Sequence, residues 1–238
     1  STTVVLHLRP YAVGLLNTEK TTPSVMFFVI FVLSIVTFDG FKSTYEWDSL
    51  NAIAIPWLAS VLYDDVYVLF SIVASAGMVG FFLIFLAVFL IVSKAMETLG
   101  GNKITNATIA NVFVITLIPI ALSYHLSHYL SLLLIQGQLI IPLLSDPFGY
   151  GWDLFGSSKY QPNIGIVNSQ FIWYFSVTAI VIGHIIAVYL AHVISLSTFS
   201  QRRSALASQY PMMGLMIFYT VVSLWIIAQP IVESRPQI

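Results

Sequence analysis

The hydrophobic residues of this chain fall into five long runs that are separated by shorter, more polar segments. Each run approaches the roughly 20 apolar residues that a helix needs to cross the hydrocarbon core of a bilayer. Helix is the expected form, because lipid cannot satisfy the backbone groups along an open strand edge. We therefore predict spanning helices near residues 24–41, 66–95, 106–134, 170–196 and 211–231.

Two further apolar segments do not fit this pattern. Residues 51–62 (NAIAIPWLASVL) are too few to span and include Pro56, so we predict an interfacial or re-entrant piece. The connection over residues 136–169 is rich in Gly, Pro and aromatic residues, and we expect residues 139–144 to dip back into the membrane. We interpret this connection either as an interfacial cap or as a lid that helps to form a site. Three of its aromatic side chains suit the headgroup layer: Tyr150, Trp152 and Phe155.

The composition supports a membrane protein and excludes several kinds of site. Hydrophobic residues make up 58% of the chain and charged residues only 8%, whereas soluble domains carry roughly 25% charged residues. The net charge of −1 lacks the excess of basic residues that is typical of nucleic-acid-binding proteins. The lack of cysteine excludes disulfides, thiolate zinc sites, cysteine-ligated iron–sulfur clusters and covalent c-type haem. We predict an all-α polytopic transmembrane helix bundle, folded as one domain over residues 24–233 behind a tail of residues 1–23.

The distribution of Lys and Arg predicts how the bundle is oriented. Of the 9 basic residues, the larger group falls on the side of the N-terminal tail: Arg9, Lys20, Lys94, Lys103, Arg202 and Arg203. The smaller group, on the other side, consists of Lys42, Lys159 and Arg235. Several carboxylates lie on that side as well. This bias places the N-terminus in the cytoplasm and the connection over residues 136–169 outside.

Four histidines lie within the predicted spans, where an ionisable side chain is costly and is often functional. Counted along the helix rise, His128 lies roughly 9 Å and His125 roughly 13 Å from the outer end of the third helix. The two are i,i+3 neighbours on one face. His184 lies roughly 21 Å deep and approaches them if the third and fourth helices pack together. His192 lies near the cytoplasmic face, where we predict a structural role.

Carboxylates and imidazoles together suggest a metal site on the outer side of the bundle. Asp39 lies near the outer end of the first helix and Glu233 follows the fifth, so either is a candidate ligand or general base. With His125, His128 and His184 they match the ligands of a mononuclear zinc, copper or iron site. A carboxylate can instead orient an imidazole, and transmembrane histidines can simply bond across helices. Pro119 is expected to kink the third helix.

Long stretches of the chain resemble a bacterial family of polytopic membrane proteins named fenitrothion hydrolases. The stretches that carry the resemblance are LRPYAVGLL near the start, TFDG at 37–40, YHLSHYLSLLLIQGQLIIPLLSDPFGYGWDLFG at 124–156, VTAIVIGHIIAVYLAH at 177–192, SQYPM at 208–212 and YTVVSLWIIAQPIVE at 219–233. The resemblance implies a bacterial inner-membrane protein that hydrolyses organophosphate triesters. Family members have further helices upstream, so the resemblance implies a split gene, a processed chain or a fragment, and it favours another membrane subunit that supplies those helices.

Three functions remain open from the sequence. In a membrane metallo-hydrolase, a divalent metal would polarise a phosphoryl oxygen and acidify bound water, and an apolar ester would enter from the bilayer. In a redox subunit, His184 and either His125 or His128 would hold b-type haem, or the same ligands would hold copper. The third alternative is a non-catalytic accessory subunit of a larger membrane complex.

Overall fold

The computed structural model describes residues 11–17, 21–62 and 65–229, and within these ranges every regular element is a helix. The α-helices are α1 (Pro23–Phe41), α2 (Tyr45–Leu62), α3 (Val66–Leu99), α4 (Asn106–Phe113), α5 (Ile118–Ile135), α6 (Ile140–Ser145), α7 (Ser169–Thr198) and α8 (Arg202–Ala228). Short 3₁₀ segments are η1 (Val13–Asn17), η2 (Val114–Leu117), η3 (Gln136–Leu139) and η4 (Ile164–Ile166). In the described residues, 5 helical segments are long and apolar enough to cross a membrane. The predicted all-α bundle is confirmed, and the chain is a multi-pass membrane protein.

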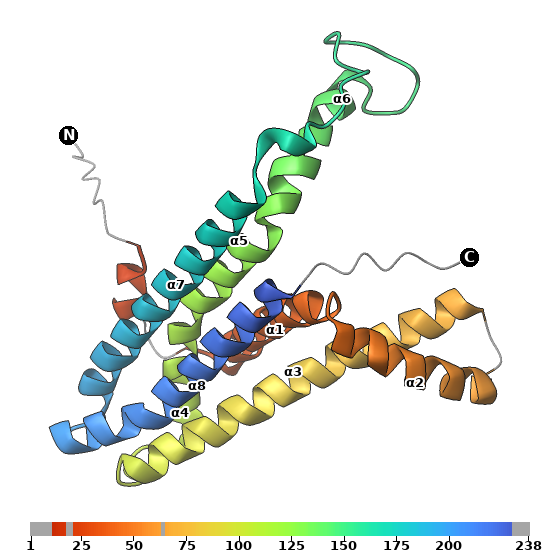
Figure 1. Cartoon of the computed structure of the whole chain (residues 1–238). Coiled ribbons are helices and arrows are strands. Elements are labelled where there is room, and N and C mark those ends of the chain that lie inside the picture. Colours follow the sequence, from red (N-terminus) through yellow and green to blue (C-terminus); the bar gives the residue numbers. More distant parts are fainter. Residues whose placement is uncertain (1–10, 18–20, 63–64, 230–238) are drawn as a thin grey trace, which may run out of the picture.

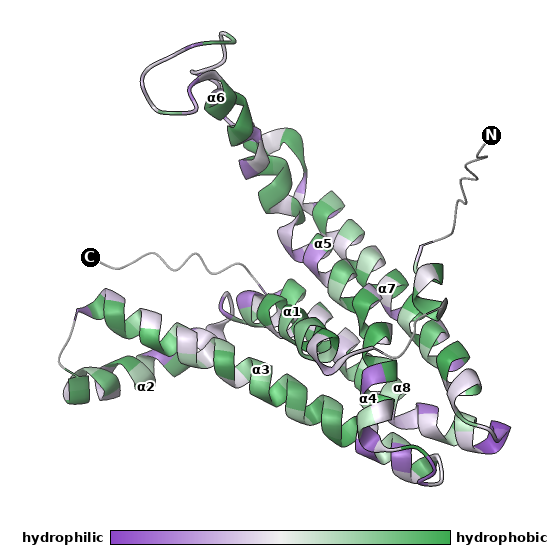
Figure 2. Ribbon diagram, turned by 180° about the vertical axis from the view of Figure 1, so that it is seen from behind, coloured by the Kyte–Doolittle hydropathy of each residue, from purple (hydrophilic) through white to green (hydrophobic). Residues whose placement is uncertain are grey.

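The helices converge at one end of the molecule and diverge toward the other (Figure 1). The end of α3 and the starts of α4 and α8 meet at the convergent end, which also holds Lys94, Lys103, Arg202 and Arg203. From there the α2–α3 hairpin forms one arm, and the adjacent helices α5 and α7 form the other. Helices α1 and α8 lie between the arms. Figure 2 shows that most ribbon faces are hydrophobic and that hydrophilic residues gather at helix ends and loops.

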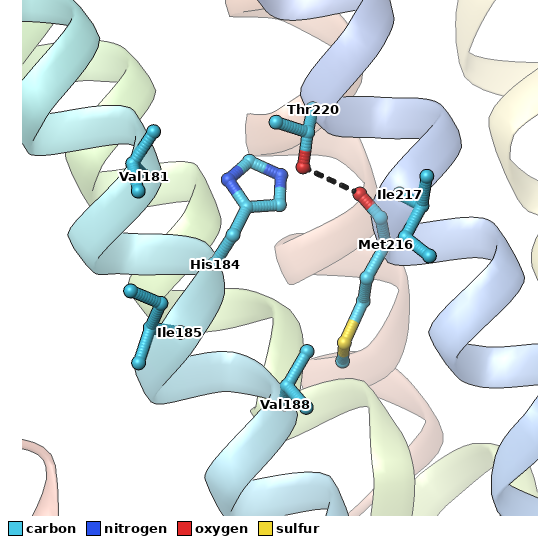
Figure 3. A pocket seen from close by; sticks show the side chains of 7 residues that line it. All are labelled: Val181, His184, Ile185, Val188, Met216, Ile217 and Thr220. Atoms are coloured by element: carbon cyan, nitrogen blue, oxygen red, sulfur yellow. Dashed lines mark hydrogen bonds between the residues drawn. The ribbon is translucent and has the colours of Figure 1, made fainter.

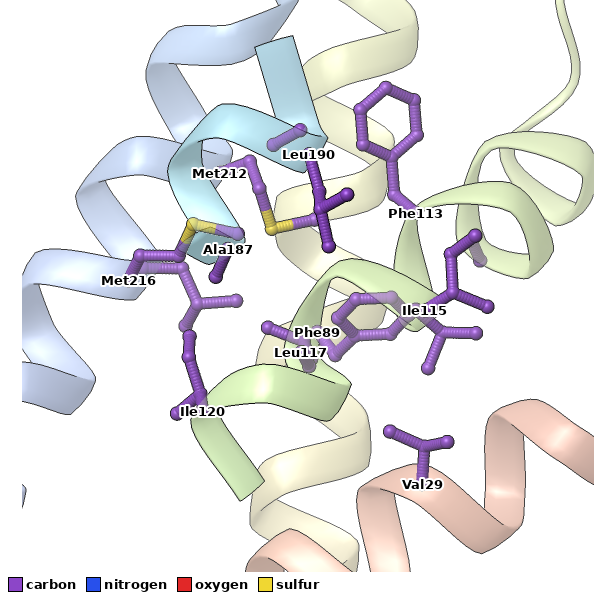
Figure 4. Packing of buried hydrophobic residues seen from close by; sticks show 14 of the residues in the cluster. Val29, Phe89, Phe113, Ile115, Leu117, Ile120, Ala187, Leu190, Met212 and Met216 are labelled. Atoms are coloured by element: carbon purple, nitrogen blue, oxygen red, sulfur yellow. The ribbon is translucent and has the colours of Figure 1, made fainter. Parts of the chain in front are cut away.

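The hydrophobic core lies near the convergent end and is filled from six of the α-helices and from η2 (Figure 4). Phe89 of α3, Phe113 of α4 and Leu117 of η2 are each 0% exposed. Val29 of α1 and Met212 of α8 close the cluster from the other sides. Side-chain packing of this kind, rather than expulsion from water, holds helices together in lipid. The core therefore fixes one end of the bundle.

The third predicted span is interrupted near its middle, as expected from Pro119, and it runs further than expected. The α-helical pattern gives way to η2 just before Pro119, because proline has no N–H to donate to the carbonyl one turn earlier. The helical path then continues through η3 and α6 as one segment of 40 residues. At 1.5 Å per residue this is about 60 Å, twice the thickness of the hydrocarbon core. The expected return of residues 139–144 is wrong, because α6 continues beyond α5 (Figure 1).

Two other boundaries differ from the sequence prediction. Helix α8 begins at Arg202 rather than near residue 211, and Pro211 lies inside it. Its polar first turns are held against α7, because the Ser195 hydroxyl donates to the carbonyl of Ala205 at 2.7 Å. Helix α2 is longer than the predicted short piece and starts at Tyr45. None of its residues is buried, and it lies along one side of α3, with Trp47 also against Phe38 and Phe41 of α1.

The connection after α6 is ordered by hydrogen bonds to Ser145 and Asp153. The buried Ser145 hydroxyl accepts from the backbone N–H groups of Phe155 at 3.0 Å and Ser157 at 3.3 Å. It also donates to Asp153 Oδ1 at 3.1 Å. The backbone N–H of Ser158 donates to the same carboxylate, and it is the main reason that the pKa of Asp153 lies below its usual range. These hydrogen bonds therefore give the loop a defined conformation.

Candidate functional site

Asp39 and His128 come together from two different helices. Asp39 lies near the end of α1 and His128 in the middle of α5, and His128 Nε2 donates to Asp39 Oδ2 at 3.0 Å. The Tyr129 hydroxyl donates to the same oxygen at 3.1 Å. Lys42 Nζ donates to the other oxygen, Asp39 Oδ1, at 2.7 Å. The carboxylate is thus held from both sides, and it is shared between a cation and an imidazole.

Small residues allow this contact to form. A Cβ atom on Gly40 would stand 2.7 Å from Ile226 Cγ2 and 2.9 Å from the Tyr124 hydroxyl. Glycine therefore lets α1 approach α5 and α8 closely at the residue after Asp39. On the other side of α5, the Ser127 hydroxyl shares its proton between the carbonyls of Ser123 at 2.8 Å and Ser176 at 3.2 Å, and Ser176 donates to the carbonyl of Ser127 at 3.3 Å. These reciprocal bonds fix α7 against the turn that carries His128.

A cavity of about 400 Å³ opens beside the pair. Its wall combines the His128 ring with serine hydroxyls, an indole and aliphatic side chains from α1, α5, α7 and α8. Its lining includes Gly40, Ser43, His128, Ser131, Trp173 and Ile226. Clefts of this size that are mostly apolar, with a few convergent polar groups, are typical of small-molecule sites. The cavity therefore marks the Asp39–His128 pair as the candidate functional site.

The hydrogen bond to Asp39 determines which nitrogen of His128 is free. A carboxylate only accepts, so Nε2 must carry the proton, and in the neutral ring Nδ1 is then the acceptor. Nδ1 of His128 has no hydrogen-bond partner among the described residues. His125 and His184 differ, since each uses Nδ1 to donate to a backbone carbonyl one turn earlier, at 2.9 Å and 2.8 Å. His128 alone among these three presents a ring held by a carboxylate.

The other predicted site residues lie apart from this pair. His125 is on α5 beside Tyr129, with ring centroids 5.9 Å apart. His184 faces α8 and lines a different cavity. Glu233 lies outside the described residues. His192 donates to Gln209 Oε1 at 2.9 Å, a contact between α7 and α8 that fits the structural role predicted for it.

The donor set of the described residues does not fit a metal centre. In the described residues no three His, Cys, Asp or Glu side chains are close enough to share an ion. Both oxygens of Asp39 are also already paired, with Lys42 on one side and with His128 and Tyr129 on the other. Zinc, copper or iron held by His125, His128 and His184 stays a prediction, as does b-type haem.

Sequence reasoning missed several parts of the site. Lys42 was used only as a topology marker, although its i,i+3 spacing from Asp39 is a signal for an ion pair. Tyr129, Gly40 and the Ser127–Ser176 pair carry no spacing signal of their own, because their roles depend on which helices are neighbours. Comparison with known proteins adds nothing to this geometry: no protein-family model, curated protein or solved structure matches the chain.

Proposed function

We propose that this protein is an integral membrane hydrolase of apolar esters, in which His128 is the general base. The observation that carries the proposal is the 3.0 Å bond between His128 Nε2 and Asp39 at the edge of the cavity. An imidazole oriented by a carboxylate is a recurrent catalytic arrangement, because the carboxylate fixes the tautomer and stabilises the imidazolium that forms. Asp39 is a positioning residue in this scheme, and Lys42 and Tyr129 hold it in place.

The reaction needs only water and the ester. His128 Nδ1 takes a proton from water, the water oxygen attacks the phosphorus or carbonyl carbon, and the bond to the leaving oxygen breaks. The leaving group departs with the electron pair as an alkoxide or phenoxide, and the proton on His128 is returned to it or to solvent. Ser43 and Ser131 line the same cavity and offer hydroxyl donors for the oxygen on which charge develops.

The proposed substrate class is an apolar organophosphate triester, and two considerations support it. The cavity wall is mainly apolar, so it accepts a ligand that is already dissolved in the bilayer. The resemblance to the fenitrothion hydrolases adds the phosphotriester chemistry. With the N-terminus in the cytoplasm of a bacterial inner membrane, the site lies on the extracytoplasmic side, at the end of α1 that is remote from Lys94, Lys103 and Arg202.

A partner subunit forms a second part of the proposal. Only 11% of the residues in the most apolar stretch of α3 are buried, although α3 is the most hydrophobic of the five spans. A surface of this kind suits either lipid or the helices of another membrane subunit, and we propose that a partner subunit covers part of it. Redox alternatives gain less support, since His128 and His184 line two different cavities.

The test is hydrolysis of diethyl 4-nitrophenyl phosphate by the protein in liposomes, followed by the absorbance of 4-nitrophenolate. His128→Gln keeps a side chain that can donate to Asp39 but removes the base, and a general base contributes roughly 100- to 10,000-fold in rate. We therefore expect kcat/KM to fall at least about 100-fold. The matched control is His192→Gln, which alters an intramembrane histidine outside the site and is expected to keep the rate. Hydrolysis that survives in His128→Gln would overturn the proposal.

A further inference from the structure

A second cavity lies between α7 and α8 and is built around His184 (Figure 3). Its volume is about 290 Å³, and its wall is aliphatic apart from His184 and Thr220. The imidazole reaches from α7 toward Met216 and Thr220 of α8. Nothing in the proposed ester hydrolysis uses this place, because the Asp39–His128 pair lies beside a different cavity.

The free nitrogen of His184 is an unsatisfied acceptor. Nδ1 donates to the carbonyl of Ile180 at 2.8 Å, so the proton of the neutral ring is on Nδ1 and Nε2 carries a lone pair. The residue is only 7% exposed, and Nε2 is buried without a hydrogen-bond partner among the described residues. A buried acceptor left unpaired costs about 1–3 kcal/mol. A ligand that donates one hydrogen bond would recover this energy.

The other polar group of the cavity does not meet this need. The Thr220 hydroxyl donates to the backbone carbonyl of Met216 at 2.9 Å, one turn back along its own helix. Its proton is therefore committed within α8 (Figure 3). The donor that pairs with His184 has to come from outside the helix pair.

The cavity reaches the outer surface of the helix pair. Val181, Ile185 and Ile217 line it and are 39%, 63% and 62% exposed on the outer surfaces of the two helices. These side chains face the hydrocarbon in a spanning pair. A cavity of about 150 Å³ accommodates benzene, so this one has room for an aromatic ring with a short alkyl chain.

From these observations we propose that the α7–α8 cavity binds a lipid-soluble molecule with a single hydroxyl donor, of the alkylphenol or alkanol class, whose O–H bonds to His184 Nε2. The apolar body of the ligand replaces acyl chains in the groove, and its hydroxyl supplies the missing proton. Plain acyl chains fill the groove too, but they leave the nitrogen unpaired. The hydroxyl is therefore what distinguishes a specific ligand from bulk lipid.

The experiment compares 4-butylphenol with 4-butylanisole, which has nearly the same shape but no donor. Retention of each probe by protein-containing liposomes is measured by equilibrium dialysis against protein-free liposomes of the same lipid. Wild-type protein is expected to retain 4-butylphenol saturably, at one molecule per chain and with about tenfold preference over the ether. His184→Phe is expected to lose the preference, and the control Thr220→Val is expected to keep it.

Two results would overturn the inference. One is equal retention of the two probes by wild-type protein, which does not depend on any variant folding. The other is an undiminished phenol preference in His184→Phe. Ester hydrolysis by the same preparations is read separately, so loss of this site and loss of the Asp39–His128 activity remain distinguishable.

Discussion

The contact between α5 and α7 at Gly183 provides the sharpest stability prediction. A Cβ atom on Gly183 would stand 2.6 Å from Ser123 Cβ and 2.9 Å from the backbone oxygen of Pro119. Ordinary contacts begin at 3.4 Å, so the atoms are short of room by 3.4 − 2.6 = 0.8 Å and 3.4 − 2.9 = 0.5 Å. Neither neighbour is the far end of a flexible side chain. Gly183→Ala therefore forces the two helices apart.

The change in the free energy of unfolding is best measured relative to the same substitution at a second helical glycine. Gly214 is also inside a helix, and apart from its chain neighbours and the nearby backbone of its own helix, no atom of the described residues lies within 4 Å of its Cβ position. Both Gly→Ala changes gain up to about 1 kcal/mol of helix propensity, but only the change at Gly183 meets the cost of overpacking, about 1–3 kcal/mol. Gly183→Ala is thus expected to be less stable than Gly214→Ala by about 1–3 kcal/mol.

Reversible unfolding in mixed micelles, with increasing SDS and a helix signal by circular dichroism, measures this difference. The separation of the helices should also break the reciprocal bonds between Ser127 and Ser176, which are already 3.2 Å and 3.3 Å long. Equal unfolding midpoints for the two alanine variants would refute the proposed close packing of α5 against α7.

Three further outcomes are expected. Tyr124→Phe removes a hydroxyl that is buried without a partner among the described residues, so the free energy of unfolding in the SDS titration should rise by about 1 kcal/mol; a loss of stability would contradict the assignment. Ser145→Ala removes the hydroxyl that accepts from Phe155 and Ser157, so amide exchange in residues 153–158 should accelerate at least tenfold while α7 keeps its protection; unchanged exchange would count against the ordered connection. The pKa of Asp153 is held below its usual range, chiefly by the Ser158 N–H, so its contribution to loop order is complete above the ordinary pKa of about 3.9 and is lost as the pH falls through the lower pKa of the folded loop. Trp152 fluorescence should report this acid transition, which should be absent in Asp153→Asn.

The spans could be predicted from the sequence, because hydrophobic length alone marks a membrane helix. The start of α8 could not, since residues 202–210 (RRSALASQY) are too polar to extend the apolar run, and they pack on α7 through contacts such as the bond from Ser195 to Ala205. The continuation of the helical segment beyond Ile135 could not be predicted either. There the Gln138 amide donates to the carbonyls of Leu134 and Asn163, which ties the returning chain to the helix.

The candidate site was predictable in part. Asp39 and His128 could both be placed toward the same end of the bundle, and a carboxylate that orients an imidazole was among the alternatives. Their pairing depends on the close approach of α1 at Gly40, which no spacing in the sequence reveals. His184 does not join them, because Gly183 packs on α5 and the next residue is turned by about 100° around the helix. That turn directs His184 toward α8.

The central claim is that Asp39 holds His128 with the proton on Nε2 and a free lone pair on Nδ1. Nitrogen-15 NMR of protein with labelled histidine in lipid measures this directly, once the His128 signals are assigned by comparison with His128→Gln. We predict a protonated-type shift for Nε2, an unprotonated-type shift for Nδ1, and a change in both in Asp39→Asn. A proton on Nδ1 of the neutral ring, or shifts that do not respond to Asp39→Asn, would contradict the account.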